Sequence, residues 1–519
     1  MCLFDFGLRD RSWAGLGLGF LLLVLSTSCG RPADNGAGPS RSSRPTSIQI
    51  GIHSDVLSFD PHRYDELLTW AVLRNLYEPL TCFDSRLRIE PCLAESWENP
   101  DELTWRFYLR SDVLFHDGSR FSAEDVVFSL ERARNHPQSA LASYLVQVED
   151  VVAVDESTVE IRTSRPYPIL LNKLAYLPLL PSGVSDDMES PIGTGAYRLV
   201  RWEPGESIEL EAFEGHWRGP PPVDRALFRP VRDPARRIEM LLDGSLDIVR
   251  EVSPWLAEEV EESRAVRLER RLGLEVQYLH LRPDWGPFRD PKVRRAVHLA
   301  LDRRVLVEEI QEGHGRPVGQ LVSANVFGFA PGVQPPEPDR EEARRLLAEA
   351  GYPDGFSVPL VTREGRDPGP IVEQLGQIGI EVRVSVQPWT ELYPRFGREE
   401  IPFYYGAAVA STADASDILD SKVHTREPGR GYGNTNFGGY SDPRVDALIE
   451  ESGSTLETIP RRELLQEAME RAMEDRVYVP LFVTYDLYGI RHEIEWRPRL
   501  DTVLLVREMR FRNTDSAPR

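Results

Sequence analysis

A histidine and several carboxylates lie close together in the stretch "RSDVLFHDGSRFSAEDVVFSLERAR", residues 110–134. His116 stands beside Asp117, and Glu124 and Asp125 follow a few positions later. Histidine and carboxylate side chains are the groups that enzymes use most often as general acids and bases. This stretch is therefore a candidate for acid and base chemistry.

The local pattern around these residues indicates a structural role instead. Asp117-Gly118 is a dipeptide typical of a turn, and it follows the strand-like residues "VLF". Ser122 has the position of a helix N-cap, so Glu124 and Asp125 fall in the first turn, where unpaired amides and the helix dipole stabilise carboxylates. The apolar residues that follow at helical spacing predict a buried face of Val126, Val127, Leu130 and Ala133. We expect a turn and a capped helix here, not a catalytic pair.

Motifs that carry known enzyme chemistry are absent from the sequence. It contains no G-x-S-x-G, no H-E-x-x-H and no phosphate-binding P-loop. The G-x-G-x-G runs at 15–19 and 429–433 do not lie between a strand and a helix, as a phosphate site requires. The histidines are scattered without metal-ligand spacing; His280 or His424 could at most help to hold a metal chelate, and an ordinary polar role is favoured for both. We predict that the protein is not an enzyme and has neither a cofactor nor a metal site of its own.

The length and the charge of the chain limit what it can bind. Its 519 residues suggest roughly two to four domains with large apolar cores. Aspartate and glutamate outnumber lysine and arginine by 83 to 61, which gives a net charge of -22. This charge repels phosphate backbones, so nucleic acid is not an expected partner. The only lysines are Lys173, Lys292 and Lys422, a scarcity typical of GC-rich coding sequences, from which we draw no function.

The first 28 residues have the features of a signal peptide. Residues 13–28, "WAGLGLGFLLLVLSTS", are uncharged and mostly apolar, but they fall short of the roughly 20 residues that a membrane-spanning helix needs. The segment ends in "LSTSC", which resembles the lipobox of bacterial lipoproteins, although Ser26 stands where leucine is usual. We expect lipidation of Cys29, with ordinary secretion and an uncleaved anchor as alternatives. Residues 29–46 then predict a flexible tether that holds the body near a membrane surface, in the periplasm or at the cell surface.

Two cysteines, Cys82 and Cys92, lie within the body of the protein. No C-x-x-C motif is present, so a zinc ribbon or a thioredoxin-like redox site is not indicated. In an oxidising compartment the two thiols could form a disulfide across a strand, a turn and a second strand. Two unpaired, partly buried thiols are the alternative, and the sequence does not decide between them.

Strand and helix patterns alternate through the body of the chain, which indicates a mixed α/β fold. Residues 104–110, "TWRFYLR", alternate in the manner of a half-buried strand, and residues 151–163 predict a hairpin. Residues 339–351 predict a helix that begins at Asp339 and stops at a glycine. Ser441 is the expected cap of another helix in "SDPRVDALIEES".

Six segments of the body, taken in order, resemble one known family. They are "SFDPHRYDELLTWAVLRNLYEPLTCFD" (58–84), "PCLAESWENPDELTWRFYLRSDVLFHDGSRFSAEDVVFSLERA" (91–133), "PIGTGAYRLVRWEPGESIELEAFEGHWRG" (191–219), "FRDPKVRRAVHLALDRRVL" (288–306), "EARRLLAEAGYPDGF" (342–356) and "NFGGYSDPRVDALIEE" (436–451). They are similar to the extracytoplasmic solute-binding proteins of ABC importers, in particular to the large peptide/nickel-type class, bacterial solute-binding protein family 5. The resemblance runs from about Ile48 to Phe511.

The resemblance implies an α/β fold of two lobes joined by a hinge, the type II periplasmic binding protein fold of the large peptide-binding class with an extra subdomain. On this sequence, the first lobe takes residues 47–273 and 483–511, with 73–189 as the appended subdomain. The second lobe takes residues 274–482, and residues 512–519 are a tail. The resemblance also implies that the lobes close on a ligand bound between them and that the closed protein, a monomer, docks on the membrane subunits of an ABC permease.

The ligand implied first is an oligopeptide or dipeptide, which in peptide-binding relatives lies in the cleft as an added strand. The cleft aromatic of the family falls on Trp389. In residues 401–422 the sequence departs from the family, because the usual tryptophan is Ala408 and the usual amine-binding aspartate is Ser411. A shift of the alignment gap would give that role to Asp414. Without the carboxylate a free α-amine of the ligand loses its ion partner. Sugars, opines, metal chelates and modified peptides therefore stay open as ligands.

Other cleft residues carried over by position are Asp55, Leu57, Tyr405 and Arg363, with Arg366 as an alternative to Arg363. For each of them a place in an exposed loop or in the core is an equally good interpretation. The glycines of "PIGTGAY" are expected to permit a tight turn near the crossing between the lobes. A ligand sensor or surface scaffold with the same fold is the alternative to import, because the docking face would look the same in either case.

Overall fold

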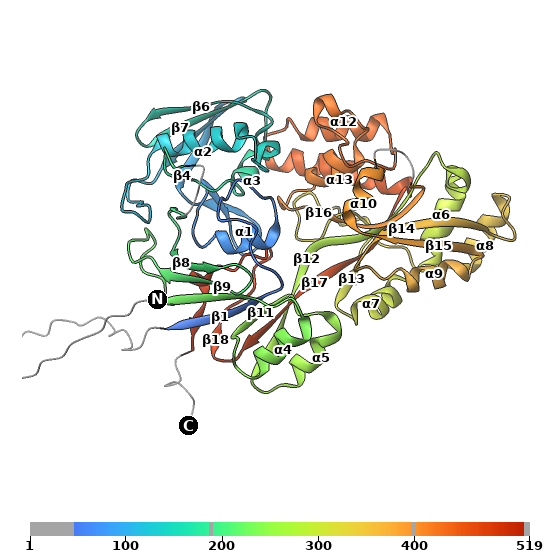
Figure 1. The fold of residues 1–519 in the computed structure, drawn as a ribbon. Helices are drawn as coiled ribbons and strands as arrows, with labels where there is room; N and C mark the ends of the chain where they lie inside the picture. The colour runs from blue at the N-terminus through green and yellow to red at the C-terminus, as the bar shows by residue number, and fades with distance from the viewer. Residues whose placement is uncertain (1–45, 186–189, 397–400, 513–519) are drawn as a thin grey trace, which may run out of the picture. The chain divides into compact units, whose positions relative to one another are not determined.

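Two long strands, β12 (Val266–Leu281) and β17 (Tyr478–Arg491), form the centre of the structure, a computed structural model that describes residues 46–185, 190–396 and 401–512. One sheet is built around them in the order β15-β14-β16-β12-β17-β11-β1-β10-β9-β8, and β13 pairs with β17 outside this path (Figure 1). The other strands of this sheet are β1 (Ser47–Ile52), β8 (Tyr197–Glu203), β9 (Ser207–Ala212), β10 (Arg225–Pro230), β11 (Ile248–Arg250), β13 (Gly315–Pro317), β14 (Phe356–Arg363), β15 (Ile380–Gln387) and β16 (Phe403–Val409).

The antiparallel pairing of β12 with β17 is irregular midway. Leu272 pairs with Tyr485 and Val276 with Val483, and the register shifts between these two pairs. On one side of the shift β17 also pairs with β11, and on the other side β12 also pairs with β16. The two central strands therefore belong to both halves of the sheet.

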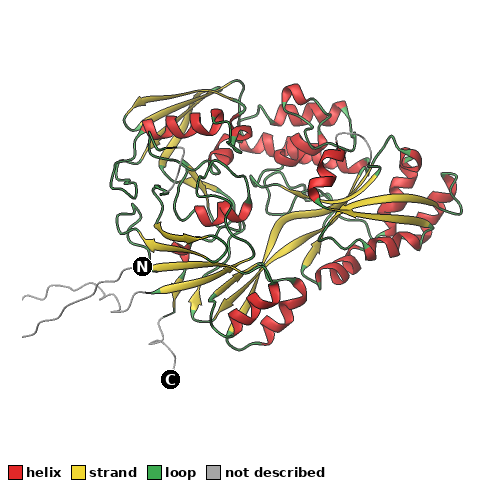
Figure 2. Cartoon of the chain, in the orientation of Figure 1, coloured by secondary structure: helices red, strands yellow, loops and turns green. Residues whose placement is uncertain are grey.

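Helices cover both faces of the half of the sheet that contains β14, β15 and β16 (Figure 2). One face packs against α6 (Pro291–Ala300), α7 (Arg303–Gln311), α8 (Arg340–Glu349) and α9 (Gly369–Gly376). The opposite face packs against α10 (Trp389–Phe396), α11 (Ser416–Ile418), α12 (Pro443–Ser452) and α13 (Thr458–Glu474). Because a strand turns successive side chains to opposite faces, Tyr405 of β16 lies in the first of these cores and Tyr404 in the second.

The other half of the sheet carries shorter helices and a separate small sheet. Its helices are α1 (Leu67–Leu73), α4 (Pro234–Leu242) and α5 (Ala257–Glu262), and the last short strands of the chain, β18 (Ile494–Glu495) and β19 (Arg510–Phe511), pair with each other. The small sheet has the order β4-β5-β7-β6 and consists of β4 (Ala94–Asp101), β5 (Thr104–Leu109), β6 (Val148–Asp155) and β7 (Thr158–Thr163). Trp105, Phe107 and Leu109 of β5 are buried, and β6 and β7 form an antiparallel hairpin. The predicted strand and hairpin are both confirmed.

The predicted capped helix is α2 (Ala123–Asn135), and its polar residues are structural. The carboxylate of Asp125 accepts hydrogen bonds from the backbone N–H of Ser122 at 2.8 Å and from that of Ser182 at 2.7 Å. The Nε2 of His116 lies 3.0 Å from the carbonyl oxygen of Gly195, and burial lowers the pKa of this histidine to about 4. The imidazole is therefore neutral near pH 7 and ties the turn to the segment around Gly195.

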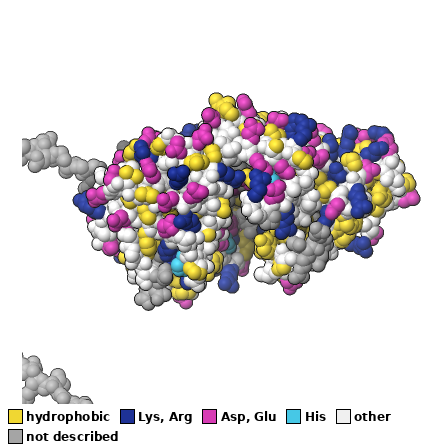
Figure 3. All heavy atoms as spheres, turned by 90° about the horizontal axis from the view of Figure 1, so that it is seen from above, with side chains coloured by type: hydrophobic (Ala, Val, Ile, Leu, Met, Phe, Trp, Pro, Cys, Tyr) yellow, Lys and Arg dark blue, Asp and Glu magenta, His cyan; other side chains and the backbone are white. Residues whose placement is uncertain are grey.

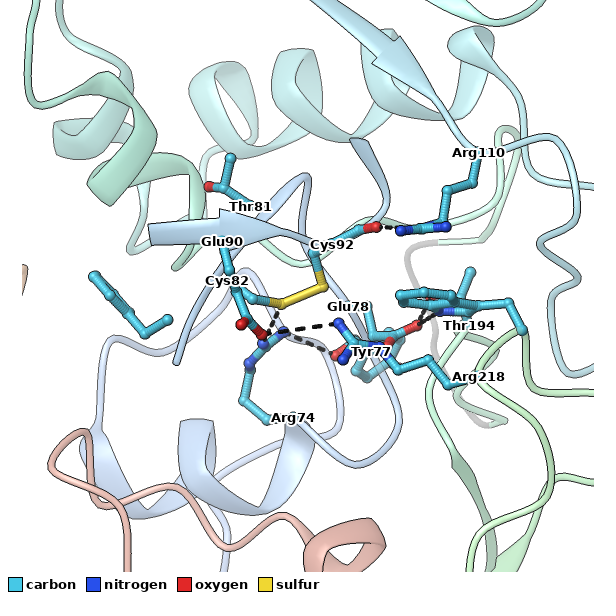
Figure 4. The surroundings of a disulfide bond; sticks show 12 residues. Arg74, Tyr77, Glu78, Thr81, Cys82, Glu90, Cys92, Arg110, Thr194 and Arg218 are labelled. Atoms are coloured by element: carbon cyan, nitrogen blue, oxygen red, sulfur yellow. Dashed lines mark hydrogen bonds and ion pairs between the residues drawn. A yellow bond between two sulfur atoms is a disulfide. The ribbon is translucent and has the colours of Figure 1, made fainter. Parts of the chain in front are cut away.

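Cys82 and Cys92 form a disulfide with a Cα–Cα distance of 5.4 Å. It joins β2 (Thr81–Phe83) to the end of the antiparallel strand β3 (Ile89–Pro91), near α3 (Leu170–Leu174). Buried polar side chains surround it (Figure 4): Arg74 donates to the Sγ of Cys82 at 3.2 Å, and the carboxylate of Glu78 accepts from Trp217 at 2.9 Å. Of the two alternatives that the sequence left open, the structure has the disulfide.

Two sequence expectations about local structure need correction. Helix α8 is capped by Asp339 as predicted, but α12 is capped by Asp442 rather than Ser441. The physical reason is Pro443, which suits the first helical position and so makes the residue before it the cap. The Oδ1 of Asp442 accepts from the backbone N–H of Arg444 at 2.7 Å.

The glycines of "PIGTGAY" are required by a close approach of two chain segments, and not by a turn. Neither Gly193 nor Gly195 has a positive φ. A Cβ on Gly193 would lie 2.1 Å from the carbonyl oxygen of Leu76, and one on Gly195 would lie 2.3 Å from that of Asn75. Any side chain at these positions would push the two segments apart.

Candidate functional site

A small cavity lies where β12, β16 and β17 meet α10 and the loop that precedes α12. Its volume is ≈ 60 Å³. Half of its lining residues are phenylalanine, tyrosine or tryptophan, and we call it the aromatic cavity. It is lined by Tyr278, His280, Trp389, Phe396, Ile401, Tyr404, Ala407, Lys422, Thr435, Phe437, Gly438 and Tyr478.

The strands supply one wall of the aromatic cavity. Tyr278 and His280 are two residues apart on β12, so their side chains point to the same face of the sheet. Tyr478 of β17 lies beside both of them, with ring centroids 5.9 Å from Tyr278 and 5.1 Å from His280. Tyr404 of β16 meets Tyr278 edge-on at 6.4 Å. The pairing of the three strands therefore fixes these four rings.

Helix α10 and the loop that precedes α12 supply the other wall. Phe396 stacks on Phe437 at 4.6 Å and meets Tyr404 edge-on at 4.9 Å. Trp389 comes two helical turns before Phe396 on the same side of α10; its ring centroid lies 6.0 Å from that of Phe396, and the residue is 48 % exposed. Phe396 is thus held inside, whereas Trp389 leaves about half of its surface open to solvent or to a ligand.

Two nitrogen-bearing side chains interrupt the aromatic lining. The Nζ of Lys422 lies 5.9 Å from the centroid of the Tyr278 ring, and burial lowers the pKa of this lysine to about 8. Burial also lowers the pKa of His280, to about 3, so its imidazole is neutral near pH 7. Gly438 covers His280 closely, because a Cβ at this glycine would lie 1.5 Å from the Cε1 of the ring.

The sequence-predicted residues Trp389 and Tyr405 differ in where the structure places them. Trp389 lines the aromatic cavity. Tyr405 is fully buried on the opposite face of the sheet, where its hydroxyl donates to the side chain of Gln277. Its neighbour Tyr404 lines the cavity instead, and the strict alternation along β16 is the signal that could have identified it.

Asp55, Leu57 and Arg363 do not line the aromatic cavity. The carboxylate of Asp55 accepts from the Nε1 of Trp202 at 3.0 Å and from the backbone N–H of Gly205 at 2.7 Å, so it holds the β8–β9 turn. Leu57 is 52 % exposed, and Arg363 is exposed at the end of β14. The structure does not bring these three residues together with Trp389.

Asp414 lies at a second, larger cavity, and Ser411 comes three residues before it in the chain. Asp414 lines a cavity of ≈ 940 Å³ that is bordered by residues 86–89, 168–172, 324–331 and 456–466. Its two carboxylate oxygens accept from Arg461 at 2.6 and 2.9 Å. The backbone carbonyl of Ser411 accepts from the hydroxyl of Tyr176. Asp414 and Ser411 thus form hydrogen bonds with other residues of the protein, Arg461 and Tyr176.

The residues that sequence reasoning missed come from distant parts of the chain. Lys422, Tyr278, Phe437 and Tyr478 are brought together only by strand pairing and by the loop between α11 and α12. Cys29, the predicted lipidation site, lies outside the described residues. Among the described residues no helix has both the length and the apolar character needed to cross a membrane. Within the same ranges, no three His, Cys, Asp or Glu side chains gather in a way that could hold a metal ion.

The face drawn in Figure 3 carries acidic and basic side chains side by side and is hollowed near its middle.

Comparison with known proteins identifies the family. Residues 88–429 match the model of the bacterial extracellular solute-binding proteins, family 5, middle region. The chain belongs to this family. The predicted family and the predicted two-lobed α/β fold are thereby confirmed.

Known relatives of this solute-binding protein cover nearly its whole length. It is 28 % identical over 452 residues to the glutathione-binding protein GsiB of Pectobacterium atrosepticum. The matched region covers 83 % of this chain and 87 % of the relative. The periplasmic binding protein DppA of Helicobacter pylori, solved with the peptide STSA, has a TM-score of 0.75, 24 % identity and coverage of 90 % and 98 %. MoaA of A. tumefaciens R10, solved with mannopinic acid, has a TM-score of 0.73, 25 % identity and coverage of 91 % and 100 %.

The family settles the general class of activity. Family 5 members are extracytoplasmic proteins that bind small ligands or peptides and deliver them to ABC permeases, and they are not enzymes. This solute-binding protein is therefore a ligand binder, and the prediction that it is not an enzyme is confirmed. The identity of its ligand is a separate question.

Proposed function

We propose that the protein captures a short peptide or a peptide-like compound and delivers it to an ABC permease. The observation that carries this proposal is the similarity to a glutathione-binding protein across 83 % of the chain. The aromatic cavity supports it, because rings such as Trp389, 48 % exposed, give apolar contact without demanding a particular side chain. We take the aromatic cavity as part of the ligand site.

The proposed binding mode does not use Asp414 to hold an amine. Its carboxylate is 2 % exposed and already pairs with Arg461, so a ligand ammonium group would have to displace a buried arginine. A peptide whose free α-amine is the main anchor is thus disfavoured at this position. Peptides that do not need a carboxylate partner for an α-amine at this position stay compatible with the proposal, and they include γ-linked peptides such as glutathione.

We further propose that the lobes are residues 47–273 with 483–511 and residues 274–482, with 73–189 as a subdomain of the first lobe. The shift of register between Leu272 and Val276 of β12 supports a hinge at this place, because a break in the ladder of hydrogen bonds is where two paired strands bend most easily. Closure about this hinge would present the liganded form to the permease.

The location of the protein is proposed from its N-terminus. Cleavage of the signal peptide before Cys29 and acylation of that cysteine would anchor the body to a membrane in the periplasm or at the cell surface. The test is incorporation of labelled palmitate and partition into detergent. Both should be lost in Cys29→Ala, and a Cys29→Ala protein that still takes up the label would contradict lipidation.

The ligand proposal is tested by native mass spectrometry of the purified protein, followed by a thermal-shift panel. The panel contains glutathione, di- and tripeptides, mannopinic acid, sugars and nickel chelates. Ligand linkage predicts that Tm rises for the class that binds. A rise with glutathione or small peptides supports the proposal. A rise with only mannopinic acid or only sugars contradicts the peptide assignment, and no rise with any solute contradicts capture itself.

A further inference from the structure

The aromatic cavity contains a lysine, Lys422, that has no acidic partner among the described residues, unlike the other two lysines of the chain. Lys173 pairs with Asp417 at 2.9 Å and Lys292 with Glu349 at 3.0 Å. Around Lys422 no described residue forms an ion pair with the Nζ, and burial alone accounts for the shift of its pKa. An ammonium group in an apolar wall destabilises the native state when it has no partner. A bound ligand with a negative charge would remove this cost.

A second group in the same cavity also lacks a partner. His280 is 6 % exposed, and its Nε2 has no hydrogen-bond partner in the described part of the chain. The ring is neutral, so one of its nitrogens carries a hydrogen and can donate it. The charge of Lys422 reaches this ring, since it helps to lower the His280 pKa. Lys422 and His280 therefore both line the same small cavity, with Gly438 covering the edge of the imidazole that carries Nε2.

We propose that the aromatic cavity is a subsite for a carboxylate-terminated arm of the ligand, with Lys422 Nζ as its ion partner and His280 Nε2 as its hydrogen-bond donor. This inference rests on the proposed function and adds the chemical class of the solute. The transported compound is an acid, and its carboxylate enters first at the end of a slender chain.

The size of the cavity limits what can enter. A water molecule needs about 10–15 Å³ of such a volume, so ≈ 60 Å³ holds roughly four to six non-hydrogen atoms. A carboxyethyl group has this size, whereas a whole dipeptide does not. The remainder of the ligand must lie outside, next to the rings of Trp389 and Tyr393, which are 48 % and 53 % exposed.

A cationic arm fits the same walls poorly. Aromatic faces attract cations, but the place beside the Tyr278 ring already holds the Lys422 ammonium group, which repels a second positive charge. No aspartate or glutamate is among the described residues that line the cavity. The charge balance therefore selects an anion.

The first experiment uses the small number of lysines. Lysine labelled with ¹³C at Cε gives one side-chain signal each for Lys173, Lys292 and Lys422, which can be assigned with lysine-to-arginine variants. Glutarate should raise the pKa of Lys422 from about 8 in a saturable manner. Glutaramide, the neutral compound of the same shape, should leave it unchanged, and the other two lysines serve as internal controls. The subsite is refuted if glutarate has no saturable effect on Lys422 or if glutaramide has the same effect.

The second experiment measures affinity by calorimetry with glutathione and mannopinic acid as probes. Lys422→Met should weaken binding on the order of tenfold to a hundredfold, the usual effect of losing a charge-assisted hydrogen bond. Lys422→Arg should keep most of the affinity, and the control Lys292→Met should keep all of it. Binding by the wild type should also weaken as the pH rises through about 8, because Lys422 then loses its charge.

Esterified glutathione distinguishes the two carboxylates that could occupy the subsite. If the glycine ethyl ester binds as well as glutathione and remains sensitive to Lys422→Met, the γ-glutamyl carboxylate enters the cavity. If the ester binds weakly and Lys422→Met costs nothing more, the glycine carboxylate enters. A solute that binds equally well to wild type and Lys422→Met refutes the subsite but leaves the proposed function standing. If no solute binds at all, the proposed function fails, and the glutarate titration still decides the subsite.

Discussion

Asp414 forms a buried ion pair with Arg461. This contact gives the aspartate a structural role, which differs from the ligand-binding role that the sequence suggested. The two side chains are 2 % and 5 % exposed and make two hydrogen bonds, at 2.6 and 2.9 Å. The contact fixes the segment before α11 to helix α13. Breaking such a pair is costly because the remaining charge stays buried without a partner.

We predict that Asp414→Ala lowers the free energy of unfolding by about 3 to 5 kcal/mol, as expected for a buried ion pair that loses one member. Urea denaturation measures this loss. The double variant Asp414→Leu with Arg461→Met removes both charges and should recover most of the stability. If Asp414→Asn keeps wild-type stability but loses ligand binding, the aspartate is a ligand group, as the family alignment allowed.

At the scale of elements, the β2–β3 hairpin depends on its disulfide. The bridge joins residues 10 positions apart, and residues 86–89 between them border the large cavity. We predict that Cys82→Ser with Cys92→Ser lowers the free energy of unfolding by about 2 to 3 kcal/mol, the loop-entropy value for a ring of this length. Urea denaturation with and without reductant measures it. Reductant should destabilise the wild type and leave the double variant unchanged; an unaffected wild type would contradict the disulfide.

Strand β17 carries a carboxyl group that makes the central strands sensitive to pH. Burial raises the pKa of Asp486 to about 7, with Glu251 and Glu275 adding to the rise and Arg250 opposing it. The native carboxyl thus keeps its proton up to about pH 7, whereas the unfolded one loses it near pH 3.8. Because the native state binds more protons in this window, its stability falls as the pH rises through it.

We therefore predict that Asp486→Asn stabilises the protein at about pH 8 by about 1 to 3 kcal/mol and has little effect at about pH 3, below both pKa values, where the wild-type group is mostly protonated in both states. Guanidinium denaturation at both pH values measures the difference. An equal effect at the two pH values would show that the asparagine acts through packing rather than through charge.

Elements were predictable from the sequence where neighbouring residues determine them. The turn at Asp117, the Ser122 cap and helix α2 all follow from contacts within a few positions, and the structure has them. The predicted cap of α12 is wrong by one residue, because Pro443 occupies the first helical position and makes Asp442 the cap. The aromatic cavity could not be predicted, since residues 278, 404, 422 and 478 meet only through long-range strand pairing. The resemblance to the family predicted Tyr405 as a ligand-binding residue, whereas the neighbouring Tyr404 lines the cavity.

At the scale of the whole molecule, the segment 165–176 contacts the segment 411–432 through polar side chains. Lys173 pairs with Asp417 at 2.9 Å, and Asn172 donates to the carbonyl oxygen of Thr412 at 2.8 Å. Arg165 donates to the hydroxyl of Tyr432 at 2.8 Å. In the proposed division into lobes, these bonds join the first lobe to the second.

Lys173 is the cation that balances several carboxylates at this contact. Burial raises the pKa of Asp420 to about 7 and that of Asp65 above its usual value, while Lys173 opposes both shifts. We predict that Lys173→Met loosens the contact more at about pH 8, where Asp420 has lost its proton, than at about pH 5.5, where Asp420 keeps it. Hydrogen exchange of residues 411–423 should rise on the order of tenfold or more, since removal of one member of a buried pair costs several kcal/mol. The exposed control Lys292→Met should not change it. An equal increase over the wild type at the two pH values would contradict a role for the charge of Asp420.

The place of β17 in the sheet also determines the order in which the chain can fold. This strand is made from residues 478–491, yet it lies between β11 and β12 in the middle of the main sheet. A chain that is synthesised from its N-terminus must therefore wait until almost all of it has emerged before either half of the sheet can close. Until β17 is in place, one edge of β11 and one edge of β12 lack their partner strand and are open to pairing with other chains.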